Sequence, residues 1–138
     1  MQEYITKSAE ETQKIAKEFA KTLKGGEIFI FSGDLGAGKT TFIQGLAEGL
    51  GVKENLTSPT FVLMKIYKGK GSLKLVHIDC YRIGSGATMS SLGLDEIFED
   101  KNNIAVVEWG ERIADILPND VAKIEFKHLS KNQRVIKI

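Results

Sequence analysis

The sequence predicts an α/β fold, a P-loop NTPase-like single domain over residues 1–138 whose mixed parallel and antiparallel sheet is flanked by helices. Strand-like apolar runs alternate with helix-like stretches along the chain. A glycine-rich phosphate-binding pattern stands between the strand-like residues 28–31 and the helix-like residues 39–50. Short turns, such as the glycine-containing residues 68–71, indicate hairpins, so some strand pairs should be antiparallel.

The N-terminal third should contain a strand, a helix and a second strand. Residues 4–6 resemble a short strand, and Ser8 with Glu11 forms a capping-box pattern at the start of a helix. This helix should stop at residues 25–26, a pair of glycines. Residues 28–31 are apolar at consecutive positions, which is typical of a strand buried on both faces. The apolar stripe of the helix consists of Ile15, Phe19 and Leu23.

The remainder of the chain continues the alternation. The helix over residues 39–50 should end at Gly51. The expected later elements are strands 61–67 and 73–79, a short helix 92–98, a strand 104–108, a brief helix 112–117 ended by Pro118, and a terminal hairpin of strands 121–126 and 134–138.

Composition limits the class of protein. The formal net charge is +1, so there is no overall electrostatic bias toward nucleic acid or an anionic membrane. One cysteine, Cys80, excludes an internal disulfide and fits a reducing compartment. No apolar run reaches the ~18 residues of a membrane-spanning helix. The N-terminus lacks a secretory pattern, so we expect a cytoplasmic protein without membrane contact.

Residues 33–40 read G-D-L-G-A-G-K-T, a complete G-x-x-x-x-G-K-[ST] phosphate-binding loop. Its backbone N–H groups should form an anion cradle at the positive end of the following helix. Gly33, Gly36 and Gly38 should allow the backbone conformations and the close approach that a Cβ would obstruct. Lys39 should contact the β- and γ-phosphates, and the Thr40 hydroxyl should ligate Mg²⁺. The pattern predicts binding of a nucleoside triphosphate with Mg²⁺.

A P-loop enzyme also needs a carboxylate at the end of a neighbouring strand, to hold Mg²⁺ or orient the attacking water. Asp79 and Glu108 each follow an apolar strand-like run. Spacing does not rank the two, and both could belong to one site.

Other candidates are open to two interpretations each. Residues 57–60 could sense the γ-phosphate or form an ordinary turn started by Ser-Pro. Arg82 could bind phosphate or pair with a surface carboxylate. Trp109 could stack on a ligand or serve in packing. We interpret His77, inside a strand, as packed rather than as a ligand, and Cys80 as structural.

The motifs occur together in a fixed order. The phosphate-binding loop is followed by S-P-T at 58–60, H-x-D-x-Y-R at 77–82 and V-E-W at 107–109. This set closely resembles the TsaE (YjeE) family, small bacterial P-loop ATPases of tRNA threonylcarbamoyladenosine biosynthesis. The resemblance runs from about Ser8 to Trp109.

The resemblance implies an ATP- and Mg²⁺-dependent ATPase that works with the TsaB and TsaD proteins. In that family TsaD transfers the threonylcarbamoyl group to an adenosine beside the anticodon. The TsaE protein is thought to use ATP hydrolysis to reset the TsaB–TsaD complex between turnovers. Contact with tRNA should therefore be indirect or weak.

The resemblance also implies roles for single residues, carried over by motif. Asp79 should take part in hydrolysis, and Thr40 with Glu108 should ligate Mg²⁺. The S-P-T threonine Thr60 matches a switch position, and Ser8 to Thr12 match the segment near the adenine. The phosphates should be held by Gly36, Ala37, Gly38, Lys39, Thr40 and Thr41.

Two departures and two alternatives accompany this interpretation. Many relatives have proline after the V-E-W tryptophan, whereas this chain has Gly110, which predicts a freer backbone there. The tail after Trp109 carries no recognisable motif. A small P-loop kinase would need an acceptor pocket and an Arg-rich lid, and the chain has three arginines and no evident lid insertion. A nucleotide-dependent regulator with little turnover would use the same phosphate and Mg²⁺ groups.

Overall fold

The computed structural model describes residues 2–33, 37–56, 64–81 and 93–138. Within these residues, seven strands form one sheet. From one edge to the other, their order is β1 (Glu3–Thr6), β7 (Arg134–Lys137), β6 (Ala122–His128), β2 (Ile28–Gly33), β5 (Asn103–Glu108), β4 (Lys74–Asp79) and β3 (Met64–Lys68).

The centre of this sheet is parallel and its edges are antiparallel. Strands β6, β2, β5 and β4 run in one direction, with β2 paired on one side to β6 and on the other to β5. Strands β3, β7 and β1 are antiparallel to their neighbours. The predicted mixed sheet is confirmed, and β5 is buried at five consecutive positions because helices or loops cover both of its faces.

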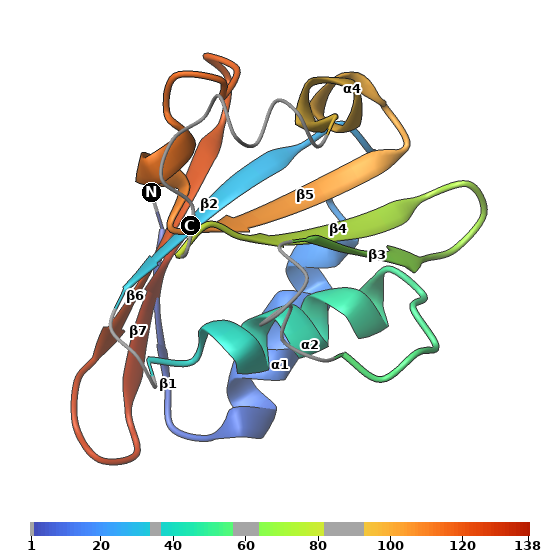
Figure 1. Cartoon of the computed structure of the whole chain (residues 1–138). Coiled ribbons are helices and arrows are strands. Elements are labelled where there is room, and N and C mark those ends of the chain that lie inside the picture. The colour runs from blue at the N-terminus through green and yellow to red at the C-terminus, as the bar shows by residue number, and fades with distance from the viewer. Residues whose placement is uncertain (1, 34–36, 57–63, 82–92) are drawn as a thin grey trace.

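The helices form layers on the two faces of the sheet (Figure 1). Helices α1 (Ala9–Ala20) and α2 (Lys39–Gly49) pack together on one face. Their core cluster includes Phe42, Phe31 and Phe126. On the other face, helix α4 (Leu94–Glu99) and the 3-10 helix η1 (Gly110–Ile113) contribute Leu94, Phe98 and Ile113 to a second cluster. None of the described helices is long and apolar enough to cross a membrane.

The first helix begins where the capping pattern predicts, with one difference. The Ser8 hydroxyl accepts the Glu11 N–H at 3.1 Å, as expected. The Glu11 carboxylate accepts the Lys7 N–H at 2.5 Å, whereas a standard capping box would use the Ser8 N–H. The cap therefore ties down one more residue of the segment before the helix.

The predicted helix over residues 112–117 is wrong. The chain forms only η1 and then a series of turns, with Arg112 N–H bonded to the Trp109 carbonyl and Ile116 N–H to that of Ile113. The cause is the sharp turn after β5. Trp109 has φ of 60°, the only positive φ among the described non-glycine residues. The expected short helix at 92–98 is present as α4, although Leu92 and residues 61–63 of the expected β3 lie outside the described part.

Helices α1 and α2 approach closely at two glycines of α2. A Cβ on Gly45 would lie 2.7 Å from the Gln13 Cα and 2.9 Å from the Ala16 Cβ of α1. A Cβ on Gly49 would lie 2.6 Å from the Ala20 Cβ. These contacts set the distance between the two helices. They thereby also position the α2 N-terminus beside the segment that precedes α1.

We predict that Gly45→Ala destabilises the protein by about 1–3 kcal/mol, because overpacking outweighs the roughly 1 kcal/mol that alanine gains over glycine in a helix. Urea unfolding followed by circular dichroism measures this. The matched control is Gln44→Ala at the neighbouring exposed position, which should stay within about 0.5 kcal/mol of the parent. An equally or more stable Gly45→Ala protein would contradict the close helix packing.

Candidate functional site

The phosphate-binding pattern lies between the end of β2 and the start of α2, as predicted. Gly38 occupies the N-cap position with φ of 102° and ψ of 10°, a left-handed conformation that favours glycine. It makes no side-chain cap, and no acidic residue follows in the first turn of α2. The first N–H groups of a helix have no partner within the helix. This helix end therefore suits an external anion.

Gly33 and Ala37, which were expected to bind the cofactor, are packed against other parts of the protein. Gly33 has φ of 144°, and a Cβ there would collide with the Phe126 carbonyl oxygen of β6. Ala37 is fully buried. Neither residue is among the described residues that line the cavity. Gly36, Thr60 and Arg82 lie outside the described residues.

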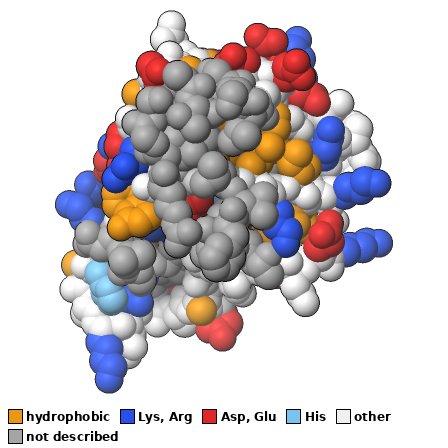
Figure 2. Space-filling model, in the orientation of Figure 1, with side chains coloured by type: hydrophobic (Ala, Val, Ile, Leu, Met, Phe, Trp, Pro, Cys, Tyr) orange, Lys and Arg blue, Asp and Glu red, His pale blue; other side chains and the backbone are white. Residues whose placement is uncertain are grey.

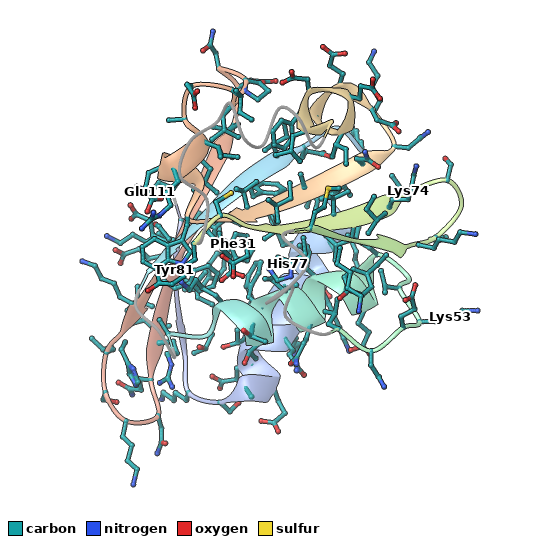
Figure 3. The ribbon with its side chains drawn as sticks, in the orientation of Figure 1. Phe31, Lys53, Lys74, His77, Tyr81 and Glu111 are labelled. Carbon is teal, nitrogen blue, oxygen red and sulfur yellow. The ribbon has the colours of Figure 1, made fainter. Side chains whose placement is uncertain are left out.

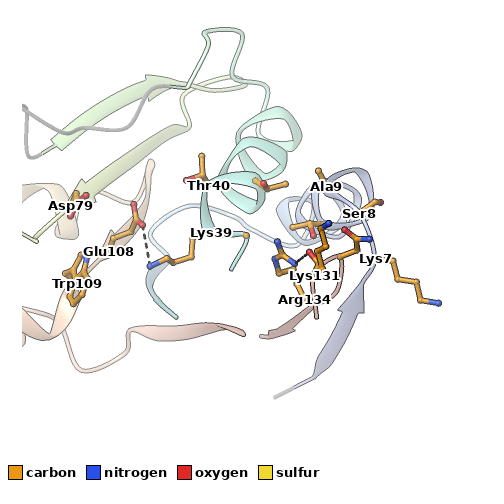
Figure 4. Close-up of a pocket in the computed structure, with 14 residues that line it drawn as sticks. Lys7, Ser8, Ala9, Lys39, Thr40, Asp79, Glu108, Trp109, Lys131 and Arg134 are labelled. Carbon is orange, nitrogen blue, oxygen red and sulfur yellow. Dashed lines mark hydrogen bonds and ion pairs between the residues drawn. The ribbon is translucent and has the colours of Figure 1, made fainter. Parts of the chain in front are cut away.

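A cavity of about 410 Å³ opens beside the start of α2 (Figure 4). One wall carries Asp79, Glu108 and Trp109 from the ends of β4 and β5. The opposite wall comes from the segment before α1 and from the hairpin between β6 and β7. The expected residues that it brings together are Ser8, Thr12, Gly38, Lys39, Thr40, Thr41, Asp79, Glu108 and Trp109.

The two acidic candidates are direct neighbours in the sheet. Asp79 and Glu108 are register partners in the parallel pair of β4 and β5, and Glu108 is also paired with Phe31 of β2. The three strands therefore end at the same edge, where α2 starts. Asp79 accepts the Tyr81 N–H at 3.0 Å, while Glu108 faces Lys39. Proximity to the lysine thus distinguishes the two acids, which spacing in the sequence had left equal.

Lys39 and Glu108 form the charged centre of the site. The Lys39 Nζ donates a hydrogen bond to the Gly33 carbonyl at 3.0 Å and lies 4.0 Å from the Glu108 Oε1. Both side chains are largely buried, with 11% and 14% exposed. The other Glu108 oxygen, Oε2, lies 2.6 Å from the His77 Nε2. Opposite charges at low exposure attract more strongly than on a surface, so these partners fix the carboxylate in place.

His77 is packed, as its place inside a strand predicts, but burial is only part of its environment. Its side chain is 6% exposed and contacts Glu108 as well as the surrounding core. The available sequence signal was the two-residue spacing from His77 to Asp79, which places both on one face of a strand. This spacing could not identify the hydrogen-bond partner, because Glu108 belongs to another strand.

Trp109, which lines the cavity, packs against Tyr81 and Arg112. Tyr81 and Trp109 have ring centroids 5.1 Å apart, and the Arg112 guanidinium lies 5.7 Å and 5.8 Å from the two rings. Trp109 is 36% exposed. It therefore packs against these side chains and also lines the cavity. Gly110 is buried in η1, and a Cβ there would meet Ile30 at 3.1 Å, so this position is tightly packed. The freer backbone expected there stays a prediction.

The opposite wall holds residues that the sequence analysis missed. The hydroxyls of Thr12 and Thr6 are hydrogen-bonded at 2.8 Å, which joins α1 to β1 beneath the cavity. Arg134 places its Nη1 within 3.3 Å of the Lys131 carbonyl and its Cγ 3.9 Å from where a Gly38 Cβ would be. Sequence carries no signal for the approach of Arg134 to Gly38, because it depends on β6 lying next to β2. The missed lining residues are Lys7, Ala9, Lys131, Asn132 and Arg134.

Cys80 is buried behind the site, and its N–H donates to the Glu108 carbonyl at 2.9 Å. Burial raises the pKa of the Cys80 thiol to about 12, with further increases from the negative charges of Asp79 and Glu111 and an opposing effect of Arg112. The thiol is therefore neutral and unreactive near neutral pH. Among the described residues, no group of three or more His, Cys, Asp or Glu side chains forms a metal-binding cluster.

Comparison with known proteins identifies the family. The family described as "Threonylcarbamoyl adenosine biosynthesis protein TsaE" matches residues 6–136. The chain belongs to the TsaE family. The crystal structure of YdiB from Bacillus subtilis superposes with a TM-score of 0.77 at 39% identity, covering 98% of this chain and 82% of that one. The predicted P-loop NTPase-like fold is thereby confirmed.

Three similar proteins with the same family name match most of this chain and at least 80% of their own length. A Bacillus subtilis protein is 42% identical over 95% of this chain and 80% of its own. A Treponema pallidum protein is 37% identical over 97% of both chains. An Aquifex aeolicus protein is 40% identical over all of this chain and 96% of its own. Each is named tRNA threonylcarbamoyladenosine biosynthesis protein TsaE.

We predict that iodoacetamide alkylates Cys80 of the folded protein at least about tenfold more slowly than that of the urea-unfolded protein at about pH 9, because only the thiolate reacts. Mass spectrometry measures the rate at the single cysteine. The folded state retains the thiol proton above the ordinary thiol pKa. The contribution of this burial to stability is therefore complete below that pKa and declines as pH rises toward about 12.

The matched control is Cys80→Ser combined with Ser72→Cys, which moves the thiol to an exposed turn. The folded control should react at the rate of the unfolded chain. Equally fast labelling of native Cys80 would show that this position is accessible, in contradiction to the buried environment.

Proposed function

We propose that this chain is a Mg²⁺-dependent ATPase of the tRNA threonylcarbamoyladenosine machinery. The observation that supports this most strongly is the Lys39–Glu108 pair in a cavity at an uncapped helix N-terminus. An anion cradle alone would serve any phosphate ligand. A carboxylate beside the loop lysine adds a group suited to a cation or to the attacking water.

The residues present fit ATP with Mg²⁺. Mg²⁺ prefers oxygen ligands and commonly takes one or two protein ligands together with substrate phosphates. The Thr40 hydroxyl and the Glu108 carboxylate are of this kind and line the same cavity. We propose that Thr40 and Glu108 hold the cation, which supplies charge neutralisation at the phosphates.

We propose separate tasks for the protein groups around the nucleotide. The N–H groups of Gly38 to Thr41 and the Lys39 ammonium bind the phosphates. Lys39 exchanges its contacts to Gly33 and Glu108 for the phosphates when the nucleotide binds, which frees Glu108 for its own task. Asp79 then orients water from the neighbouring strand end. Ser8 and Thr12, on the opposite wall, lie where the nucleoside would extend.

The family supports a place in tRNA modification. The relatives are named for threonylcarbamoyladenosine biosynthesis, and we extend that role to this chain. We propose that it works in the cytoplasm with the TsaB and TsaD proteins, resetting their complex by ATP hydrolysis. On the described part of the face shown in Figure 2, acidic side chains lie together with scattered Lys and Arg side chains. The formal net charge of +1 gives no overall attraction to the tRNA backbone, which supports indirect contact with tRNA.

We predict that Lys39→Ala lowers ATP affinity by about 2 kcal/mol, or about 30-fold, because a charged contact to the phosphates is lost. Calorimetry with a non-hydrolysable ATP analogue measures this. The matched control is Lys53→Ala, which removes the same charge from an exposed position directed away from the cavity (Figure 3). Equal affinities of Lys39→Ala and the parent would refute the phosphate-site assignment.

We predict that depletion of this chain in its own cell lowers threonylcarbamoyladenosine in bulk tRNA, measured by mass spectrometry of nucleoside digests. A plasmid copy of the parent or of Gln44→Ala should restore the modified nucleoside, whereas Lys39→Ala should not. Normal levels in depleted cells would exclude the tRNA-modification role while leaving the nucleotide site intact. Restoration by Lys39→Ala would show that the role does not need nucleotide binding.

A further inference from the structure

In the hydrogen bond between His77 and Glu108, the chemistry of the two groups determines which one is the donor. The His77 Nε2 and the Glu108 Oε2 are 2.6 Å apart. An ionised carboxylate only accepts hydrogen bonds, so Nε2 must carry the proton and donate it. The contact occupies Oε2 and leaves Oε1 on the side of Lys39, at 4.0 Å from its Nζ. The two oxygens of one carboxylate therefore have different environments.

The strand register explains why this contact is rigid. His77 pairs with Val106 of β5 and with Lys65 of β3, so its backbone is held on both sides. Its side chain lies on the face of the sheet that α2 covers (Figure 3). Glu108 follows Val106 by two residues, on the same face. A glutamate side chain otherwise has several rotamers, and ordering it costs conformational entropy. A fixed donor selects one of them.

We propose that His77 is a positioning residue for Glu108: its Nε2–H holds Oε2 so that Oε1 is presented to the part of the cavity that contains Lys39 and accepts a divalent cation. This inference rests on the proposed Mg²⁺-nucleotide site and deepens it. Hydrogen-bonded partners behind a metal-binding carboxylate commonly contribute 10- to 100-fold in metal affinity. His77 thus acts through Glu108 and does not itself contact the nucleotide.

The test measures the Mg²⁺ concentration that half-saturates the tightening of ADP binding, by calorimetry at increasing Mg²⁺. ADP avoids turnover, so the readout is binding alone. His77→Phe keeps a ring but removes the donor, and should raise this concentration about tenfold. His77→Gln keeps an N–H at similar reach and should stay within about threefold of the parent. ADP affinity without Mg²⁺ should be unchanged in both variants.

A packing control separates positioning from general loss of structure. Leu75→Ala removes buried volume on the same face of β4, two residues before His77, and its register partner on β5 is Ile104, four residues before Glu108. It should lower the melting temperature and leave the Mg²⁺ half-saturation at the parent value. If His77→Phe does not fold, His77→Asn serves instead. Its amide is too short to reach Glu108, so the hydrogen bond to the carboxylate is lost in the same way.

The outcomes decide between the two levels of inference. The positioning role is overturned if the Mg²⁺ half-saturation of His77→Phe and His77→Asn equals that of the parent. It is also overturned if His77→Gln raises this concentration as much as His77→Phe does. It also fails if His77→Phe adds a further loss to Glu108→Ala, since a residue that acts only through Glu108 should have no effect without it. If Mg²⁺ does not tighten ADP binding in the parent, the proposed Mg²⁺-nucleotide function fails, and this inference with it.

Discussion

The parallel pairing of β5 between β2 and β4 is the constraint on which the candidate site depends. It places Glu108 beside Phe31 on one side and beside Asp79 on the other. Since α2 follows β2 through the phosphate-binding loop, the same pairing brings Lys39 to Glu108. The carboxyl ends of parallel strands are a general location for ligand sites, because side chains from several strands converge there. A change in sheet order would separate the acid from the loop.

Charge and burial work together at this edge. Removing a carboxylate from water is costly unless opposite charges and hydrogen bonds compensate. Glu108 has both kinds of partner, with Lys39 near one oxygen and His77 bonded to the other. The same partners restrict its side chain, so a carboxylate that is expensive to bury is also well ordered. Asp79, whose described hydrogen bond comes from the Tyr81 N–H, has a different environment at the neighbouring strand end.

Most elements of the fold could be predicted from local patterns. The buried strands, the loop and the helix after it are encoded by neighbouring residues, as are the hairpins. The prediction of a helix at 112–117 was wrong although the residues have helical apolar spacing. The turn at Trp109 and the packing of Gly110 on Ile30 limit the chain to a 3-10 helix. Tertiary contact there overrides helix propensity, which amounts to less than about 1 kcal/mol per residue.

The sequence by itself determined the phosphate-binding loop, the two strand-end acids and the resemblance to one family, because each rests on residues close together in the chain or in a fixed order. Only the tertiary structure decided that Glu108 lies next to Lys39, that His77 bonds to it, and that the β6–β7 hairpin with Arg134 completes the cavity. These contacts join residues from strands distant in sequence. Their formation depends on the packing of the whole sheet and on its strand order, which no local spacing specifies.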